Sequence, residues 1–447
     1  MIRRSPEPVE TEPAPPLWEQ VAALLVVVML TQALIGPIFA PTQEETPILR
    51  LVWLPVYAVI AGLCALRWER LVRVWPAILL LALLVLHAFA SKWWSIDPAV
   101  TQRRVIALAI TGAFSVYLGA AFRGVHLPRL LMIGGLLMGI GSVFMVFAFP
   151  AIGIHQTDNA GLWRGLWYEK NQMGIVMVAS ALAAAACLAA DARRWRLATA
   201  TLVLASLLVL ASQSKTSLLC LIIGLGGIGA LWAMRKGGPA FAVAGTWMGV
   251  VVSALAAYIF ITDREAVLVA LGKDPSLTGR TDIWSALMRM VADHPWTGFG
   301  YSAFWGRDSV PAAMIRQETQ WPVPSAHNGW IDLLIQLGWP GAILTGLVIA
   351  FALVATVIRI PNAGAREGYF SIAYLAVFLL LSMSESVLLS QSNLPWTLLL
   401  AILARAVAPD PEPVRVPLAP GRRQAYQPRS RIAAQYAHGQ SRRPLRL

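Results

Sequence analysis

The feature that most constrains this chain is a series of long apolar runs. About twelve such runs recur between residues 17 and 408, and each has the roughly 20 residues that a helix needs to cross a hydrocarbon core of about 30 Å. Lipid offers no hydrogen bonds to the backbone, so the runs predict an all-helical, polytopic membrane protein. They lie at 17–41, 48–66, 72–91, 104–122, 127–150, 171–190, 195–211, 216–234, 239–262, 327–357, 368–388 and 394–408.

The positions of the charges predict which helix ends share a side. If the N-terminus is cytoplasmic, 23 of the 36 Lys and Arg residues fall in inside segments, and every short inside segment carries at least two. This alternation follows the positive-inside tendency and places both termini in the cytoplasm. It also accounts for the formal charge of +13 without nucleic acid as a partner.

The same reading divides the chain into three parts. Residues 1–16 form a cytoplasmic segment, 17–408 the transmembrane domain, and 409–447 a disordered basic cytoplasmic tail rich in Pro and Arg. No cleavable signal peptide is evident after the basic start MIRRSPEP. The three cysteines all fall in apolar runs, which indicates small core residues rather than disulfides or a zinc site; they are Cys64, Cys187 and Cys220.

The longest outside loop, residues 263–326, is polar and aromatic. Within it TDIWSALMRMVADHP predicts a short amphipathic helix, with Ile283, Leu287, Met290 and Val291 on one face. The loop also holds four tryptophans, which serve either as anchors at the membrane surface or as stacking faces for sugars. These are Trp284, Trp296, Trp305 and Trp321.

Three shorter outside segments contain cations, against the positive-inside tendency. A bound anion would explain them, and the alternative is pairing with nearby carboxylates or lipid phosphate. The cations are Arg103, Arg104, Arg164, Lys170 and Lys215.

One histidine stands where the large loop meets a membrane helix. The stretch SAHNGWIDLLIQLGWPG passes from polar loop to apolar run at His327-Asn328-Gly329, so His327 is either a working residue or a helix cap. His294, before Pro295, is the rival as a base. Glu385 lies near the outer end of the eleventh run, where a carboxylate is rare, and is either a site residue or the partner of an outside arginine.

Six motifs carry a resemblance to a known family. They are WSIDPAVTQRR, RGLWYEKNQMG, SQSKTSLL, GRTDIW, HPWTGFGYSAFW and SAHNGWIDLLIQLG, in this order between residues 91 and 341. In them the chain resembles the O-antigen ligase and O-antigen polymerase family of bacterial envelope glycosyltransferases. The resemblance implies a C-type glycosyltransferase (GT-C-like) membrane fold in the bacterial inner membrane, with undecaprenyl-diphosphate-linked glycans as donors on the periplasmic side. It also implies that Arg164, Arg280 and His327 are functional residues, with Lys170 and Lys215 as further basic positions.

These residue types suit such a reaction. Cleavage of a sugar–diphosphate bond leaves a pyrophosphate anion, which guanidinium groups such as those of Arg164 and Arg280 would stabilise. An imidazole, whose ordinary pKa is about 6.5, can accept the proton of the incoming sugar hydroxyl, and His327 fits that role. Direct displacement would invert the anomeric carbon. Asn328, Glu385, Arg103 and Arg104 are additional candidates.

No cofactor or metal is expected. The outside loops contain no Asp-x-Asp and no His/Asp cluster, so we predict a metal-independent transfer. The acceptor is either another lipid-linked glycan, as in a polymerase, or lipid A-core, as in a ligase, and other polysaccharide export components are expected partners. The large-loop motifs look closer to exopolysaccharide polymerases. A lipid-linked glycan transporter is the alternative from another class, but transporters place their ionisable residues near the bilayer midplane.

Overall fold

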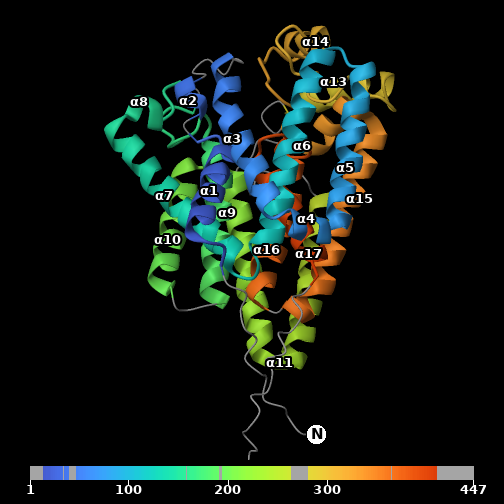
Figure 1. Cartoon of the computed structure of the whole chain (residues 1–447). Helices are drawn as coiled ribbons and strands as arrows, with labels where there is room; N and C mark the ends of the chain where they lie inside the picture. The colour runs from blue at the N-terminus through green and yellow to red at the C-terminus, as the bar shows by residue number, and fades with distance from the viewer. Residues whose placement is uncertain are drawn as a thin grey trace, which may run out of the picture. The chain divides into compact units, whose positions relative to one another are not determined.

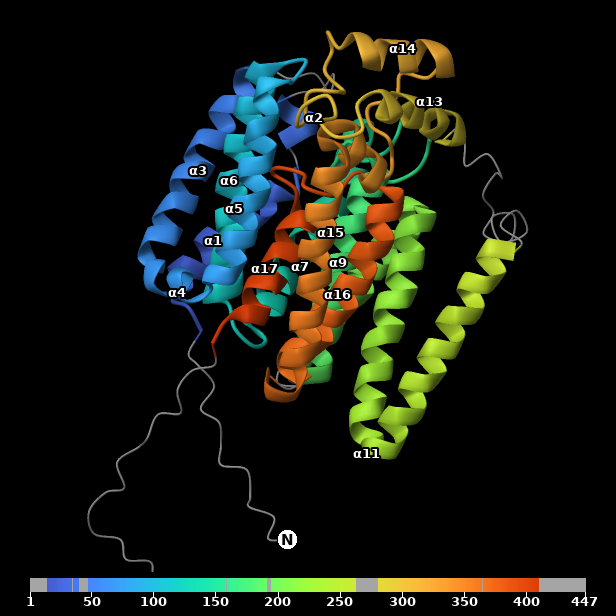
Figure 2. The ribbon, with the colours of Figure 1, turned by 90° about the vertical axis from the view of Figure 1, so that its right-hand side faces the viewer.

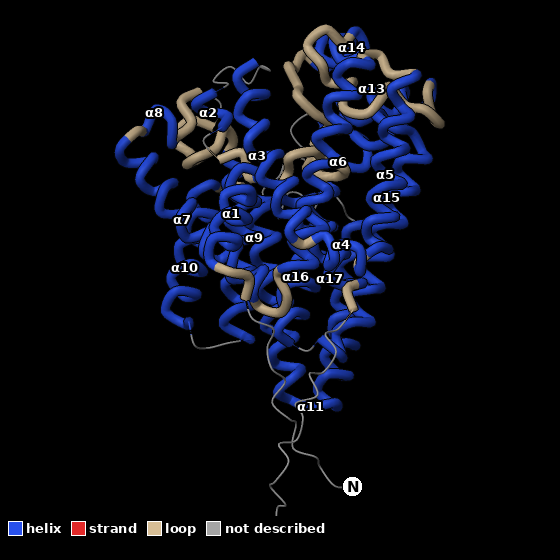
Figure 3. The backbone as a smooth tube through the Cα atoms, in the orientation of Figure 1, coloured by secondary structure: helices blue, strands red, loops and turns tan. Residues whose placement is uncertain are grey.

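The structure of the protein is a computed structural model, and it describes residues 14–33, 35–39, 47–157, 159–190, 194–262, 280–363 and 365–409. The expectations for residues 1–13, for the tail from 410 and for the first part of the large loop, 263–279, lie outside these residues. In the described part of the chain the secondary structure is helical apart from one isolated bridge between Ile154 and Trp163. Figure 3 shows the helices and their connections.

A helix forms at each of the twelve apolar runs (Figure 1). Among the described residues, eight helical segments are long and apolar enough to cross a membrane, and three shorter apolar helices accompany them. Two neighbouring runs, 216–234 and 239–262, form the two halves of α11, which bends at Gly238. The all-helical polytopic membrane fold is therefore confirmed. The helices are α1 (Leu17–Leu30), α3 (Pro47–Leu66), α5 (Trp75–Ala90), α6 (Pro98–Ala121), α7 (His126–Ala148), α9 (Lys170–Ala190), α10 (Trp195–Ser212), α11 (Lys215–Thr262), α15 (Gly329–Ala363), α16 (Ala365–Ser384) and α17 (Leu394–Val407).

The first apolar run is not one continuous helix. Helix α1 ends at Leu30, a turn follows, and the short helix α2 (Ile35–Phe39) comes next. The turn has Gln32 at φ 61°, and the indole N–H of Trp167 donates to the Thr31 carbonyl at 2.8 Å. This bond satisfies a carbonyl that the end of the helix leaves without an intrahelical partner. Hydropathy alone did not reveal the break because both pieces are apolar.

The large loop folds into short helices at one end of the bundle. Helix α13 (Arg280–Asp293) confirms the predicted amphipathic helix, and its buried face includes Ile283, Leu287 and Val291. Helix α14 (Val310–Thr319) was not predicted; the Ser309 side chain caps it by accepting from the backbone N–H of Ala312. The remaining short elements are α4 (Trp68–Arg73), α8 (Pro150–Gly153) and the 3-10 turn η1 (Ser91–Trp93).

Loops lie at two opposite ends of the helices. One end, which we call the site end, carries α13 and α14 above the long helices (Figure 2). The loop before α6 lies at the same end, since the backbone N–H of Ile96 donates to Phe299 O at 3.1 Å. At the opposite end lie α4 and the bend of α11 at Gly238 (Figure 2). Exposed tryptophans occur near both ends, as expected at the two edges of a membrane. They include Trp93, Trp94, Trp296 and Trp339 near the site end and Trp18, Trp68, Trp75 and Trp195 near the opposite end.

Helix α15 is broken at Gly338, and the large loop fills the break. Gly338 has φ 63°, and the backbone N–H of Trp339 donates to Pro295 O at 2.8 Å. Just before the break in α15, the carbonyls of Ile335 and Gln336 accept from the backbone N–H groups of Phe299 and Gly300, at 2.9 Å each. A Cβ at Gly338 would lie 2.6 Å from Pro295 O, so this approach requires glycine. These bonds fix the TGFGY segment against the helix that follows His327.

Candidate active site

His327 lies in the turn that leads into α15, and its backbone is unusual. Its φ is +49°, a left-handed conformation that few non-glycine residues adopt. The next residue caps the helix: Asn328 Oδ1 accepts from the backbone N–H groups of Trp330 and Ile331 at 3.0 and 3.3 Å. Capping therefore belongs to Asn328. The imidazole of His327 is left to make other contacts.

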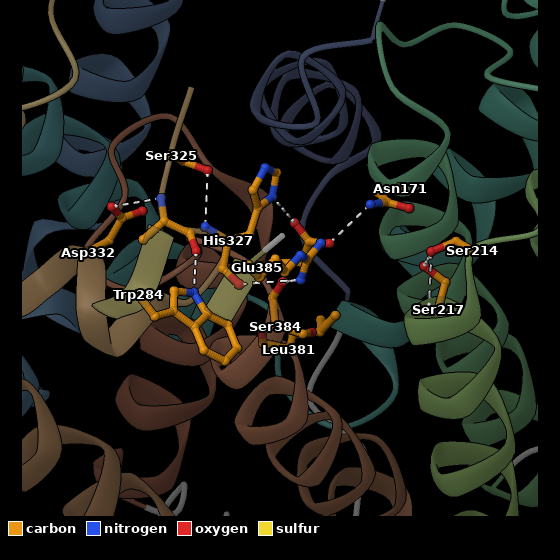
Figure 4. Close-up of polar contacts among 12 residues, drawn as sticks. Asn171, Ser214, Ser217, Trp284, Ser325, His327, Asp332, Leu381, Ser384 and Glu385 are labelled. Carbon is orange, nitrogen blue, oxygen red and sulfur yellow. Dashed lines mark hydrogen bonds and ion pairs between the residues drawn. The ribbon is translucent and has the colours of Figure 1, made fainter. Parts of the chain in front are cut away.

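The His327 imidazole faces a carboxylate from another part of the chain. Its Nδ1 lies 3.9 Å from Oε2 of Glu385, in the loop between α16 and α17, and both side chains are mostly buried, at 21% and 15% exposed. The Asn171 amide, on the first turn of α9, donates to the other Glu385 oxygen at 3.2 Å. Figure 4 shows Glu385 between His327 and Asn171. The structure thus assembles three segments around one carboxylate.

Aromatic side chains hold the histidine segment. The Trp321 ring stacks on the His327 ring with centroids 5.7 Å apart and planes 8° from parallel. The indole N–H of Trp284 donates to the Ala326 carbonyl at 2.8 Å. Buried Asp332 accepts from the Ala326 N–H at 3.2 Å and from the Trp305 indole at 2.6 Å. Three of the four loop tryptophans therefore position this segment, whereas Trp296 is 69% exposed.

Arg280 joins the two backbone segments that carry His327 and Glu385. It is the first residue of α13, and its Nη1 donates to Ser384 O at 3.0 Å and to His327 O at 3.5 Å. Among the described residues its hydrogen bonds use Nη1 alone. The guanidinium is therefore beside the His327–Glu385 pair and can offer its remaining N–H groups to an anion.

Lys170 and Lys215 begin α9 and α11, and their ammonium groups are near enough to repel each other. Lys170 precedes Asn171, so this pair of cations lies on the α9 side of Glu385. The two helices approach closely because α9 has a glycine there: a Cβ at Gly174 would lie 2.3 Å from Ser217 Oγ. The SQSKTS motif is held by its own serines, with Ser217 Oγ donating to Ser214 Oγ at 3.0 Å.

Arg164 is placed differently from the other predicted site residues. Its guanidinium donates to three backbone carbonyls, those of Ile152, Ala151 and Tyr168, at 2.7, 3.1 and 3.3 Å. Two of these belong to α8, whose single turn leaves its carbonyls without helical partners. No hydrogen bond or ion pair between described residues joins Arg164 to His327. In this structure Arg164 braces the loop before α9.

The other sequence candidates lie around the cluster. Arg103 is exposed on α6, and half-buried Arg104 interacts electrostatically with Tyr301. Burial raises the pKa of Tyr301, whose hydroxyl donates to Leu389 O at 2.7 Å. His294, the rival base, is exposed and packs its ring against Phe299 at 4.6 Å, and no described interaction brings it to Glu385.

Some residues of the cluster were not singled out from the sequence. Asn171 and Asp332 lie inside the motifs YEKNQMG and SAHNGWID, but only the fold shows that one contacts Glu385 and the other supports Ala326. The signal for Asp332 was a carboxylate in the first turn of an otherwise apolar helix. Within the described part of the chain no group of three or more His, Cys, Asp and Glu side chains could hold a metal ion. The metal-free reaction remains a prediction.

The fold and this cluster define a multi-pass membrane protein with a polar, cation-flanked site at one end of its helices. Residues 200–346 match the family model described as O-antigen ligase. The chain is also 26% identical over 313 residues to the exopolysaccharide production protein ExoQ of Rhizobium meliloti (strain 1021), which covers 67% of this chain and 68% of that protein. The resemblance to the O-antigen ligase and polymerase family is thereby confirmed, and both matches support a membrane enzyme that processes O-antigen or exopolysaccharide. Four of the six motifs fall within the matched residues.

Proposed function

We propose that the protein polymerises lipid-linked repeat units of an exopolysaccharide or O-antigen by metal-independent, inverting glycosyl transfer. The observation that carries this proposal is the His327–Glu385 pair at 3.9 Å, with Arg280 bonded to the backbone on both sides of it. A base beside fixed cations is what attack of a sugar hydroxyl on a sugar–diphosphate donor requires. The site end faces the periplasm in this proposal, where lipid-linked glycans are presented.

The chemistry assigns a separate task to each group. The acceptor hydroxyl gives its proton to His327, its oxygen bonds to the anomeric carbon, and the bond from that carbon to the diphosphate breaks. With its proton on Nδ1, towards the Glu385 carboxylate 3.9 Å away, the imidazole would keep the lone pair of Nε2 for the acceptor. The carboxylate then stabilises the imidazolium that forms, as in other His–carboxylate pairs. The lipid diphosphate leaves with both electrons of the broken carbon–oxygen bond.

The cations would bind the diphosphate as its charge grows. Arg280 offers N–H groups beside His327, and Lys170 and Lys215 supply charge from the ends of α9 and α11. Because Arg164 donates hydrogen bonds to three backbone carbonyls, we propose that it holds the loop before α9 in shape. It could bind the glycan donor only if bonds to the diphosphate replaced these bonds to the carbonyls.

Polymerisation is preferred to ligation for two reasons. The similar protein from Rhizobium meliloti is named for exopolysaccharide production, and the loop above the site is aromatic, which suits an extended glycan. Ligation to lipid A-core is the second candidate, supported by the name of the matching family model.

Deletion of the gene in its own bacterium distinguishes the two. A polymerase predicts that single repeat units accumulate on undecaprenyl diphosphate and that high-molecular-weight polymer disappears while the lipopolysaccharide core is unchanged. Complementation with the wild-type gene should restore the polymer, and His327→Ala should not. Long polymer that stays on the lipid carrier but is missing from lipid A-core would identify a ligase instead.

A further inference from the structure

A second cluster of charges lies at the opposite end of the bundle, far along the helices from His327. Glu367, near the start of α16, accepts from the Arg405 Nε at 2.8 Å and from the Gly124 N–H at 2.6 Å, and its other oxygen lies 3.4 Å from the Arg359 Nε. The side chains of Arg359, Glu367 and Arg405 are only 10–11% exposed. With Arg123, which interacts electrostatically with Arg405, they form what we call the arginine cluster.

The arginine cluster has more positive charge than its own carboxylate can balance. Glu367 bonds to the guanidinium groups of Arg405 and Arg359, and Arg123 and Arg359 both repel the charge on Arg405. The buried Nη1 of Arg405 has no hydrogen-bond partner among the described residues. A buried charged donor without an acceptor is costly, so the arrangement favours an anion that brings oxygens to this point.

The surroundings suit an amphipathic anion. A shallow pocket beside Arg359 and Arg405 is lined by the hydroxyl-bearing residues Thr356 and Ser371. An adjoining hollow along Arg405 is mostly apolar: it is lined by Phe122, Leu127, Pro128, Phe370 and Ile402, together with Gly124, Glu367 and Ser371. The cluster is at the ends of α15, α16 and α17, which is the level of the headgroups in a membrane that these helices cross. Guanidinium groups would meet a phosphate there, and the apolar wall would meet an acyl chain.

We propose that the arginine cluster binds the phosphate of an anionic phospholipid headgroup. Arg405 and Arg359 supply the charged donors, Thr356 and Ser371 supply hydroxyls, and the apolar hollow receives the start of a lipid chain. Glu367 holds the two arginines in place and also limits how strongly they attract the anion. This site is separate from the glycan-transfer proposal, and either can fail without the other.

The test uses the full-length protein in detergent micelles with one added lipid at a time. Native mass spectrometry counts bound lipid, and a titration gives the affinity for phosphatidylglycerol and for zwitterionic phosphatidylcholine. Wild-type protein should bind one phosphatidylglycerol in preference to phosphatidylcholine. Arg405→Gln should weaken that binding by about tenfold or more, since it removes a charge-assisted bond. Arg196→Gln is the matched control, because Arg196 is exposed, packs over the Trp195 ring and lies outside the arginine cluster. This variant should bind phosphatidylglycerol with wild-type affinity.

Glu367→Gln separates lipid binding from a purely structural ion pair. If the cluster binds an anion, removal of the competing carboxylate should strengthen phosphatidylglycerol binding even where the protein becomes less heat-stable. Equal binding of the two lipids, wild-type affinity in Arg405→Gln, or unchanged affinity in Glu367→Gln would each overturn the proposal. Displacement of phosphatidylglycerol by inorganic phosphate at equal concentration would assign the site to a soluble phosphate and overturn its assignment to a lipid.

Discussion

Replacement of Glu385 by Gln should slow glycan transfer while leaving the donor bound. The substitution keeps the size of the side chain. It also keeps one oxygen that can face His327 Nδ1, which lies 3.9 Å from Glu385 Oε2, and a second polar group that can bond to Asn171. It removes the negative charge. Its effect should therefore appear where His327 becomes an imidazolium, in the transition state, rather than in the bound ground state.

The separation of the two groups sets the size of the effect. Two unit charges 3.9 Å apart attract by about 4 kcal/mol at the effective dielectric constant of about 20 that suits protein sites. Because both side chains are partly exposed and the proton is only partly transferred, about 2–4 kcal/mol is expected, which corresponds to a loss of roughly 30- to 1,000-fold in rate.

The assay is single-turnover transfer by purified protein in proteoliposomes, with a lipid-linked donor of defined structure. Glu385→Gln should reduce the rate at saturating donor and leave the concentration for half-saturation within about threefold. Glu318→Gln is the matched control, since Glu318 is an exposed acid of α14 that pairs with Arg289 away from the site. If Glu385→Gln keeps at least half of the wild-type rate while His327→Ala is inactive, the carboxylate does not assist the base.

Four further outcomes are expected. His327→Ala and Arg280→Ala should each reduce transfer, by about 10²–10⁴-fold for loss of the base, with membrane insertion intact in an extraction assay. Asn328→Ala should lower the free energy of unfolding by about 1 kcal/mol through loss of the α15 cap, seen as an earlier thermal transition, whereas an unchanged transition would refute the capping role. Transfer should persist in EDTA, and recovery on added Mg²⁺ after chelation would contradict the metal-free reaction. In a cysteine-free background, Asp308→Cys should react with a membrane-impermeant reagent in whole cells and Arg73→Cys should not; the reverse would invert the proposed orientation.

The membrane fold was predictable because hydropathy and charge act locally along the chain. Helices formed in all the apolar runs, although the first run is split between α1 and α2. The break after Leu30 and the helix α14 were not predicted. The first depends on a hydrogen bond from Trp167, which is distant in sequence, and the second on a serine cap in a segment without a repeating apolar face.

Single residues of the candidate site could be predicted from the sequence, but the contacts between them could not. His327 and Glu385 stood out singly, because each is an ionisable group at the edge of an apolar run. Their pairing depends on how α15 and α16 pack, and the role of Asn171 depends on α9, so neither follows from spacing in the chain. Arg164 shows the converse. Its residue type suited an anion, and only the structure shows that three backbone carbonyls already use it.

The most direct measurement is transfer by the purified protein with undecaprenyl-diphosphate-linked repeat units as the sole glycan substrate. If the proposal is correct, wild-type protein converts them into a ladder of lipid-linked polymer in EDTA, with the new linkage inverted relative to the donor, and His327→Ala forms no ladder. Absence of polymer from repeat units alone, with transfer appearing only when lipid A-core is added, would contradict polymerisation.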